Sequence, residues 1–207
     1  HANNASVPLA WLPDPPTAPR AINVPDGVAV SWFAPQTNTA SGGVATGYRV
    51  YHSTNGYGFG LVCATTNTGV TLTNLCSGAT GFFRVTALNT GGESLPSEVV
   101  AARRSASGRA YHLVVNGFTR FDRSLSPTRY FGANILGNVT MVRPRQINSF
   151  DYAVQHGQAI AAADRYFDSC GHAAVVSNIV HLTNYHAVYW ILGEESTADE
   201  TFSSSEQ

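Results

Sequence analysis

The chain has 207 residues, of which 43% are hydrophobic and only 12% are charged. This length fits one large domain or two small ones, and the apolar fraction excludes a chain that is disordered throughout. The net charge is −1 and all 12 basic residues are arginine, which excludes a polycation that binds nucleic acid through bulk charge. No run reaches the roughly 18 apolar residues that a membrane-spanning helix needs.

The N-terminal stretch is rich in proline. Pro8, Pro13, Pro15, Pro16 and Pro19 lie close together, and proline favours extended, semi-rigid backbone. We expect residues 1–15 to be a linker or the remnant of an upstream domain.

Short strands separated by turn residues follow as far as about residue 102. The segments 28–33, 48–52 and 83–87 alternate apolar and polar positions, the period of a half-buried strand, and Gly- and Asn-rich clusters separate them. This pattern predicts an antiparallel β-sandwich. The residues expected to point inward are Val30, Trp32, Tyr48, Val50, Phe83 and Val85.

Three motifs carry a resemblance to a known family. The segments 16–19 (PTAP), 28–35 (VAVSWFAP) and 47–51 (GYRVY) resemble the first half of a fibronectin type III domain, and 83–98 resembles its last two strands. The resemblance covers residues 16–102 and implies an all-β immunoglobulin-like sandwich. One departure is Gly81, which stands where the family usually has its corner tyrosine.

Two cysteines fall inside this predicted domain. A disulfide between Cys63 and Cys76 suits an exported protein and could add about 2–3 kcal/mol of stability. The alternative is a pair of buried free thiols, because sequence does not place the two side chains. Cys170 is left without a partner.

Residues 109–207 have a different pattern. A buried strand is predicted over 110–115, a helix after Ser149, and further strands over 173–176 and 187–192. Strands alternating with a helix indicate a partial α/β domain with a mainly parallel sheet. Ser203 and Glu206 have the spacing of a capping box at a helix start, so we expect an α/β domain that is truncated at its C-terminus.

A second resemblance involves the segments 113–118 (LVVNGF), 148–157 (NSFDYAVQHG) and 190–196 (WILGEES). They resemble exported bacterial proteins in which a fibronectin type III module precedes a class I glutamine amidotransferase-like domain. Such proteins are labelled xanthan lyase, carry a golvesin-type C-terminal domain or include an N-acetylmuramoyl-L-alanine amidase domain. The resemblance implies a secreted, periplasmic or cell-surface protein, associated with polysaccharide or peptidoglycan.

Few residues are candidates for catalysis. Cys170, with His172 two positions later, is the one potential nucleophile, but we expect it to follow the end of a helix, whereas amidotransferase chemistry needs a sharp strand-to-helix turn. No catalytic residue is therefore assigned. The sequence has no HExxH or CxxC pair, so neither common zinc signature is present. His1 resembles the edge of a zinc amidase motif, and zinc would then belong to an upstream domain, with no cofactor in this fragment.

Two groups of charged residues are candidate ligand contacts. Residues 103–145 carry eight arginines, including Arg120, Arg123 and Arg129, against one acid, and aromatic residues lie among them. This stretch could bind an acidic polysaccharide, or its arginines could pair with the acidic stretch 194–206. Glu194 and Glu195 follow a predicted strand, where α/β sheets place ligand sites, or they solvate a loop.

Two function classes follow. In the first, the chain is a non-catalytic spacer and interaction segment of an exported bacterial multidomain protein, in contact with neighbouring domains of the same chain and with polysaccharide or peptidoglycan. In the second, it belongs to a cell-wall hydrolase or polysaccharide lyase whose active site lies outside this fragment. Neither a nucleic-acid partner nor a membrane span is expected.

Overall fold

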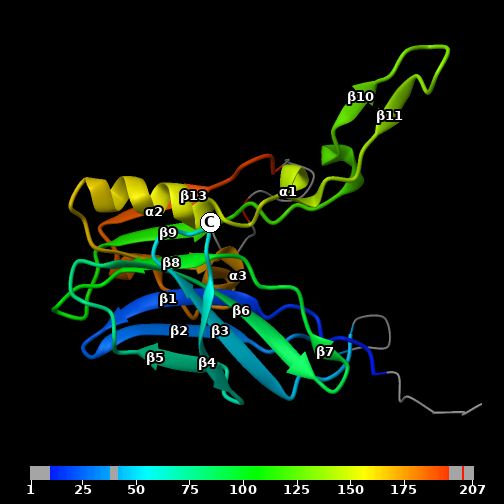
Figure 1. The fold of residues 1–207 in the computed structure, drawn as a ribbon. Helices are drawn as coiled ribbons and strands as arrows, with labels where there is room; N and C mark the ends of the chain where they lie inside the picture. The colour runs from blue at the N-terminus through cyan, green and yellow to red at the C-terminus, as the bar shows by residue number, and fades with distance from the viewer. Residues whose placement is uncertain (1–9, 38–41, 196–201, 203–207) are drawn as a thin grey trace, which may run out of the picture.

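The structure is a computed structural model that describes residues 10–37, 42–195 and 202 (Figure 1). Its N-terminal half is a sandwich of two antiparallel layers. One layer contains β1 (Thr17–Val24), β2 (Gly27–Phe33) and β5 (Gly69–Leu72). The other contains β3 (Gly47–Ser53), β4 (Gly60–Thr65), β6 (Thr80–Asn89), β7 (Gly92–Glu93) and β8 (Val100–Arg103). The predicted alternation of the strands is confirmed.

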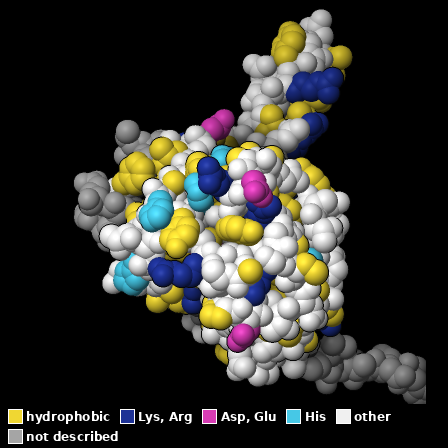
Figure 2. Space-filling model, turned by 90° about the vertical axis from the view of Figure 1, so that its left-hand side faces the viewer, with side chains coloured by type: hydrophobic (Ala, Val, Ile, Leu, Met, Phe, Trp, Pro, Cys, Tyr) yellow, Lys and Arg dark blue, Asp and Glu magenta, His cyan; other side chains and the backbone are white. Residues whose placement is uncertain are grey.

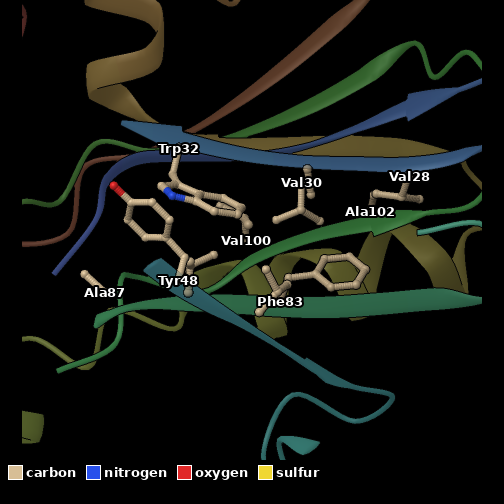
Figure 3. Packing of buried hydrophobic residues seen from close by; sticks show 11 residues of the cluster. Val28, Val30, Trp32, Tyr48, Phe83, Ala87, Val100 and Ala102 are labelled. Atoms are coloured by element: carbon tan, nitrogen blue, oxygen red, sulfur yellow. The ribbon is translucent and has the colours of Figure 1, made fainter. Parts of the chain in front are cut away.

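The core of the sandwich lies between these layers (Figure 3). All six residues that the sequence placed inward belong to it: Val30, Trp32, Tyr48, Val50, Phe83 and Val85. The Trp32 ring meets the Tyr48 ring edge-on, with centroids 5.3 Å apart. At Gly81, a Cβ atom would lie 2.5 Å from the Phe83 ring. The family's corner tyrosine is therefore replaced here by a glycine over which Phe83 packs.

The C-terminal half contributes three parallel strands, β9 (His112–Asn116), β12 (Phe167–Gly171) and β13 (Ala187–Ile191). The helices are α1 (Pro144–Ile147), α2 (Tyr152–Ala162) and α3 (His172–Val176), with 3₁₀ turns η1 (Arg123–Leu125) and η2 (Leu182–Asn184). The predicted strand over 173–176 is wrong, because those residues form α3 and the strand precedes them. None of the helices in the described part of the chain is long and apolar enough to cross a membrane.

The two halves share one sheet. The six-stranded order is β13-β9-β12-β1-β2-β5, so the parallel strands continue the layer of the sandwich that contains β1. β1 and β12 run antiparallel, with Arg20 opposite Cys170 and Ala21 opposite Ser169. The sheet is therefore mixed, and the backbone polar groups on the second edge of β1 bond to β12 instead of facing solvent.

Helix α2 packs against the outer face of the sandwich. Val154 of α2, Phe82 of β6 and Phe167 of β12 belong to one buried cluster. The loop between β3 and β4 comes so close that a Cβ atom on Gly56 would lie 2.4 Å from a methyl group of Val154. Gly56 also has a φ of +85°, a conformation that favours glycine. This second core joins the halves through side chains as well as backbone.

A two-stranded arm, β10 (Thr128–Tyr130) and β11 (Asn138–Thr140), projects away from the body of the molecule (Figure 1). Ile135 and Leu136, in the turn between these strands, are exposed. The sequence predicted no regular structure here.

The predicted disulfide is not formed. Cys63 and Cys76 are both free thiols. Cys63 lies in β4, where it packs partly against the sandwich core, and Cys76 is exposed in the loop that follows β5 of the opposite layer. The two cysteines thus belong to segments on different layers, which the sequence spacing did not reveal.

Candidate functional site

Cys170 lies near the end of strand β12, directly before helix α3. It is the penultimate residue of β12, and α3 begins at His172, so the expectation that it follows a helix is wrong. The backbone at Gly171 is extended, with φ −70° and ψ 149°, and lacks the strained turn that exposes a nucleophile. Cys170 is only 1% exposed. Burial, together with the nearby carboxylates of Glu98 and Asp168, raises the pKa of its thiol, so the thiolate is strongly disfavoured.

A buried polar network surrounds Asp168, which the sequence analysis did not single out. Its Oδ1 accepts hydrogen bonds from the backbone and side-chain nitrogens of Asn23, each at 2.8 Å. Its Oδ2 accepts a hydrogen bond from the Tyr185 hydroxyl at 2.9 Å. Burial raises the pKa of Asp168 to about 6, although these hydrogen bonds oppose the shift. The network ties β1 to β12, which is a structural role.

A second carboxylate, partly buried, lies at the other end of β12. Glu98, in the segment between β7 and β8, accepts a hydrogen bond from the side-chain nitrogen of Asn116 at the end of β9. Its Oε1 would lie 2.0 Å from a Cβ atom on Gly171, so a larger residue at this position would displace the Glu98 carboxylate. Burial raises the pKa of Glu98 to about 7. The signal for Asp168 was available in the polar letters of the strand FDSCG, but its partner Asn23 lies far away in sequence.

The structure brings Arg120, Glu194 and Glu195 together at the carboxyl ends of β9 and β13. Glu195 Oε1 accepts hydrogen bonds from the backbone nitrogens of Thr119, at 2.6 Å, and Arg120, at 2.7 Å. The Arg120 guanidinium donates to the carbonyl oxygen of Glu194 at 3.3 Å and also pairs with Asp122. These candidate ligand residues therefore bind one another and stabilise the loops.

Arg123 and Arg129 lie apart from that group. Arg123 begins η1. Arg129 is exposed on β10 of the arm, with its guanidinium 5.3 Å from the centroid of the Phe131 ring. The arginine-rich stretch is thus spread over the arm, its base and the sandwich junction, rather than gathered on one surface.

No group of three or more metal-ligating side chains occurs within residues 10–37, 42–195 and 202. His1 lies outside the described residues, as does the predicted capping box at Ser203 and Glu206. A surface hollow of about 650 Å³ lies on the sandwich beside Trp11, Val44 and Asn89. Among the described residues, its lining contains no titratable side chain that could act as an acid or a base.

Comparison with known proteins identifies the N-terminal half. A family model described as fibronectin type III domain matches residues 14–103. Comparison with curated proteins yields no match.

Solved structures resemble about half of the chain. Domains A168–A170 of titin share 30% identity over 42% of this chain and 30% of that one, with a TM-score of 0.38. The twitchin kinase region of C. elegans shares 27% over 47% of this chain and 18% of that one, with a TM-score of 0.41. A fibronectin type III domain from human KIAA0970 protein shares 22% identity over 46% of this chain and 76% of that one, with a TM-score of 0.40.

The chain spans less than a third of the titin and twitchin structures. The assignment of the N-terminal half therefore depends on the family model and on the sandwich described above. Residues 14–103 of this chain form a fibronectin type III domain with an immunoglobulin-like β-sandwich.

Proposed function

We propose that this chain is a non-catalytic spacer and interaction segment of an exported bacterial multidomain protein that acts at the cell envelope or on polysaccharide. Fibronectin type III domains are commonly spacers or interaction modules in multidomain proteins, and one occupies residues 14–103. The observation that carries the proposal is the pairing of β1 with β12, which places both halves in one sheet. A spacer of this kind would fix the relative orientation of the neighbouring domains joined to its two halves.

The parallel strands with α2 and α3 would be the start of a class I glutamine amidotransferase-like domain. In support, the three segments that carry the resemblance lie next to one another. Gly117 donates a backbone hydrogen bond to Ile191 at 2.9 Å, and the Asn148 side chain donates to the carbonyl oxygen of Phe118 at 3.0 Å. Because Cys170 is buried, this half would have a binding or structural role.

The rigidity of the spacer is testable by a distance measurement between spin labels. One label goes on the exposed Cys76 and the other on Ala162→Cys at the end of α2, in a Cys63→Ser background. Cys170 is only 1% exposed, so we expect it not to react in the folded protein. The proposal predicts one narrow distance distribution, as narrow as that between Cys76 and Leu95→Cys within the sandwich. A broad or multiple distribution for the first pair alone would contradict it.

The non-catalytic role has a separate test. The purified chain should hydrolyse neither glutamine nor peptidoglycan or polysaccharide. Hydrolysis that is lost in Cys170→Ala would overturn the proposal and assign catalysis to this chain.

A further inference from the structure

Aromatic and basic side chains gather at one end of the molecule, where the three parallel strands begin. His112 is in register with both Phe167 and Ala187. The residues that directly precede these three strands are Tyr111, Tyr166 and His186. We call this surface the end face, and its members are Arg103, Arg109, Tyr111, His112, Arg165, Tyr166, His186 and Tyr189. Figure 2 shows this end of the molecule, where arginine and histidine side chains are interspersed with apolar ones and few acidic side chains are visible.

The rings of the end face are held in two stacks between β9 and β13. Tyr111 and His186 stack with centroids 4.6 Å apart and planes 13° apart. His112 and Tyr189 stack at 5.9 Å, and the His112 Nδ1 lies 3.1 Å from the Tyr189 hydroxyl. Even so, the tyrosines Tyr111 and Tyr189 remain 46% and 38% exposed. These rings are therefore positioned in advance and can stack on a ligand with little loss of side-chain entropy.

The arginines of the end face are close to these rings along the chain or in space: Arg165 directly precedes Tyr166, and Arg109 is two residues before Tyr111. The Arg103 guanidinium lies 5.2 Å from the centroid of the Tyr166 ring and forms an ion pair with Asp164 at 2.7 Å. Arg109 and Arg165 are exposed, and no ion pair joins either of them to an acid among the described residues. A guanidinium with no acidic partner can bind a ligand carboxylate through two parallel hydrogen bonds.

We infer that the end face binds an acidic polysaccharide, a chain of sugar rings that carry carboxylates. The exposed rings of Tyr111, Tyr166 and Tyr189 stack against the C–H faces of sugar rings, while Arg109 and Arg165 pair with carboxylates. A nucleic acid fits less well, because affinity for a polyphosphate comes from many cationic contacts. This chain has no lysine, and its net charge is −1. A neutral glycan would leave both arginines without a partner.

This inference rests on the interaction role proposed above and names its ligand. It differs from the site expected from the sequence, since Arg120 is engaged with Asp122 and Glu194, and Arg129 lies on the arm. Arg109 belongs to the arginine-rich stretch 103–145, whereas Arg165 lies outside it, and the place of Arg165 beside the start of β9 depends on the register of β12.

The test is titration calorimetry of the full chain with polygalacturonate, alginate and hyaluronan. Fully methyl-esterified polygalacturonate, which keeps the sugar rings and loses the charge, is the ligand control. We expect binding to at least one acidic polymer, and binding about tenfold weaker both for the ester and for Arg109→Gln/Arg165→Gln. The matched control variant Arg123→Gln/Arg129→Gln, with exposed arginines elsewhere, should bind as the wild type does.

Stacking has its own variant, Tyr111→Leu/Tyr189→Leu, which should weaken binding to the acidic polymer and also abolish any residual binding to the ester. Circular dichroism verifies that each variant is folded. Three results would overturn the inference: no binding to any of the acidic polymers, unchanged affinity in Arg109→Gln/Arg165→Gln, or binding of poly(dT) at least as tight as that of the polysaccharides. If the acidic polysaccharides do not bind while the distribution of spin-label distances is narrow, the spacer proposal stands and only this inference is wrong.

Discussion

Phe82 and Phe83 are neighbours in β6, and their rings pack into two different cores. Phe83 lies inside the fibronectin type III sandwich with Val30 and Val85. Phe82 points the other way, into the cluster that contains Val154 of α2. A single strand thus contributes one wall to each core, which couples the stability of the two halves.

Phe82→Ala is predicted to destabilise the whole chain, although its ring lies outside the sandwich core. Truncating a fully buried phenylalanine costs about 3–5 kcal/mol of unfolding free energy. We expect a loss of this size for Phe82→Ala and for Phe83→Ala in denaturant titrations followed by fluorescence. Leu95→Ala is the control, since Leu95 is 77% exposed and its loss should change little. An unchanged unfolding midpoint for Phe82→Ala would show that the second core contributes nothing.

Trp32 fills the centre of the sandwich, with 1% of its surface exposed. Trp32→Ala should cost about 3–5 kcal/mol because it leaves a large cavity. Trp32→Phe should cost much less, because it keeps most of the ring volume and removes an indole N–H that has no hydrogen-bond partner in the described structure. Urea unfolding of the two variants tests this order, and equal losses would contradict it.

The three thiols should differ in reactivity. Cys76 is exposed, Cys63 is partly buried and Cys170 is buried. Iodoacetamide labelling of the native, unreduced protein should modify Cys76 first and Cys63 more slowly, with Cys170 modified only after unfolding. Mass mapping measures all three at once. A linked peptide pair containing Cys63 and Cys76 would contradict the free thiols of the structure.

Glu98 makes stability depend on pH. Its folded-state pKa of about 7 lies above the ordinary value of 4.5, so the folded protein binds more protons than the unfolded chain between these values. The contribution of Glu98 to the unfolding free energy therefore falls as the pH rises from 4.5 to 7, by an amount on the order of 3 kcal/mol. Glu98→Gln should remove this contribution, so the variant should gain stability relative to the wild type as the pH is raised.

The measurement is the difference in unfolding free energy between Glu98→Gln and the wild type, taken at pH 5 and at pH 7.5. Both proteins contain the same histidines, so the contribution of histidine titration cancels in this difference. Glu93→Gln is the matched control. Burial opposes ionisation of Glu93, but hydrogen bonds from Thr86, Tyr51 and Arg49 lower its pKa overall, so its replacement should destabilise at pH 7.5. A difference between Glu98→Gln and the wild type that does not vary with pH would rule out the raised pKa of Glu98.

The sandwich was predictable because its signals are local. Trp32 and Val30 alternate with polar neighbours within one strand, so periodicity alone places them inside. The run 173–176 was misassigned because a short apolar stretch fits a strand or a buried helix equally well. The true strand, β12, contains Asp168 and Ser169, whose partners are Asn23 and the backbone of Ala101. Burial of such polar residues depends on contacts that no local pattern reveals.

The junction itself could not be predicted for the same reason. Arg20 and Cys170 face each other across strands separated by most of the chain, and no sequence period marks that pairing. The end face likewise exists only because β9 lies between β12 and β13. Residues such as Tyr111 and His186 have ordinary surroundings in sequence and become neighbours only through the order of the strands.

The measurement that tests the shared sheet most directly is native-state hydrogen exchange of the backbone amides in β1, β2 and β12. If the pairing of β1 with β12 joins the halves into one cooperative unit, the amides of Ser169 and Cys170 should exchange through global unfolding, with the same free energy as those of β2. If the amides of residues 112–191 instead exchange through a separate opening of much lower free energy, while β2 stays protected, the two halves are independent and the rigid spacer is wrong.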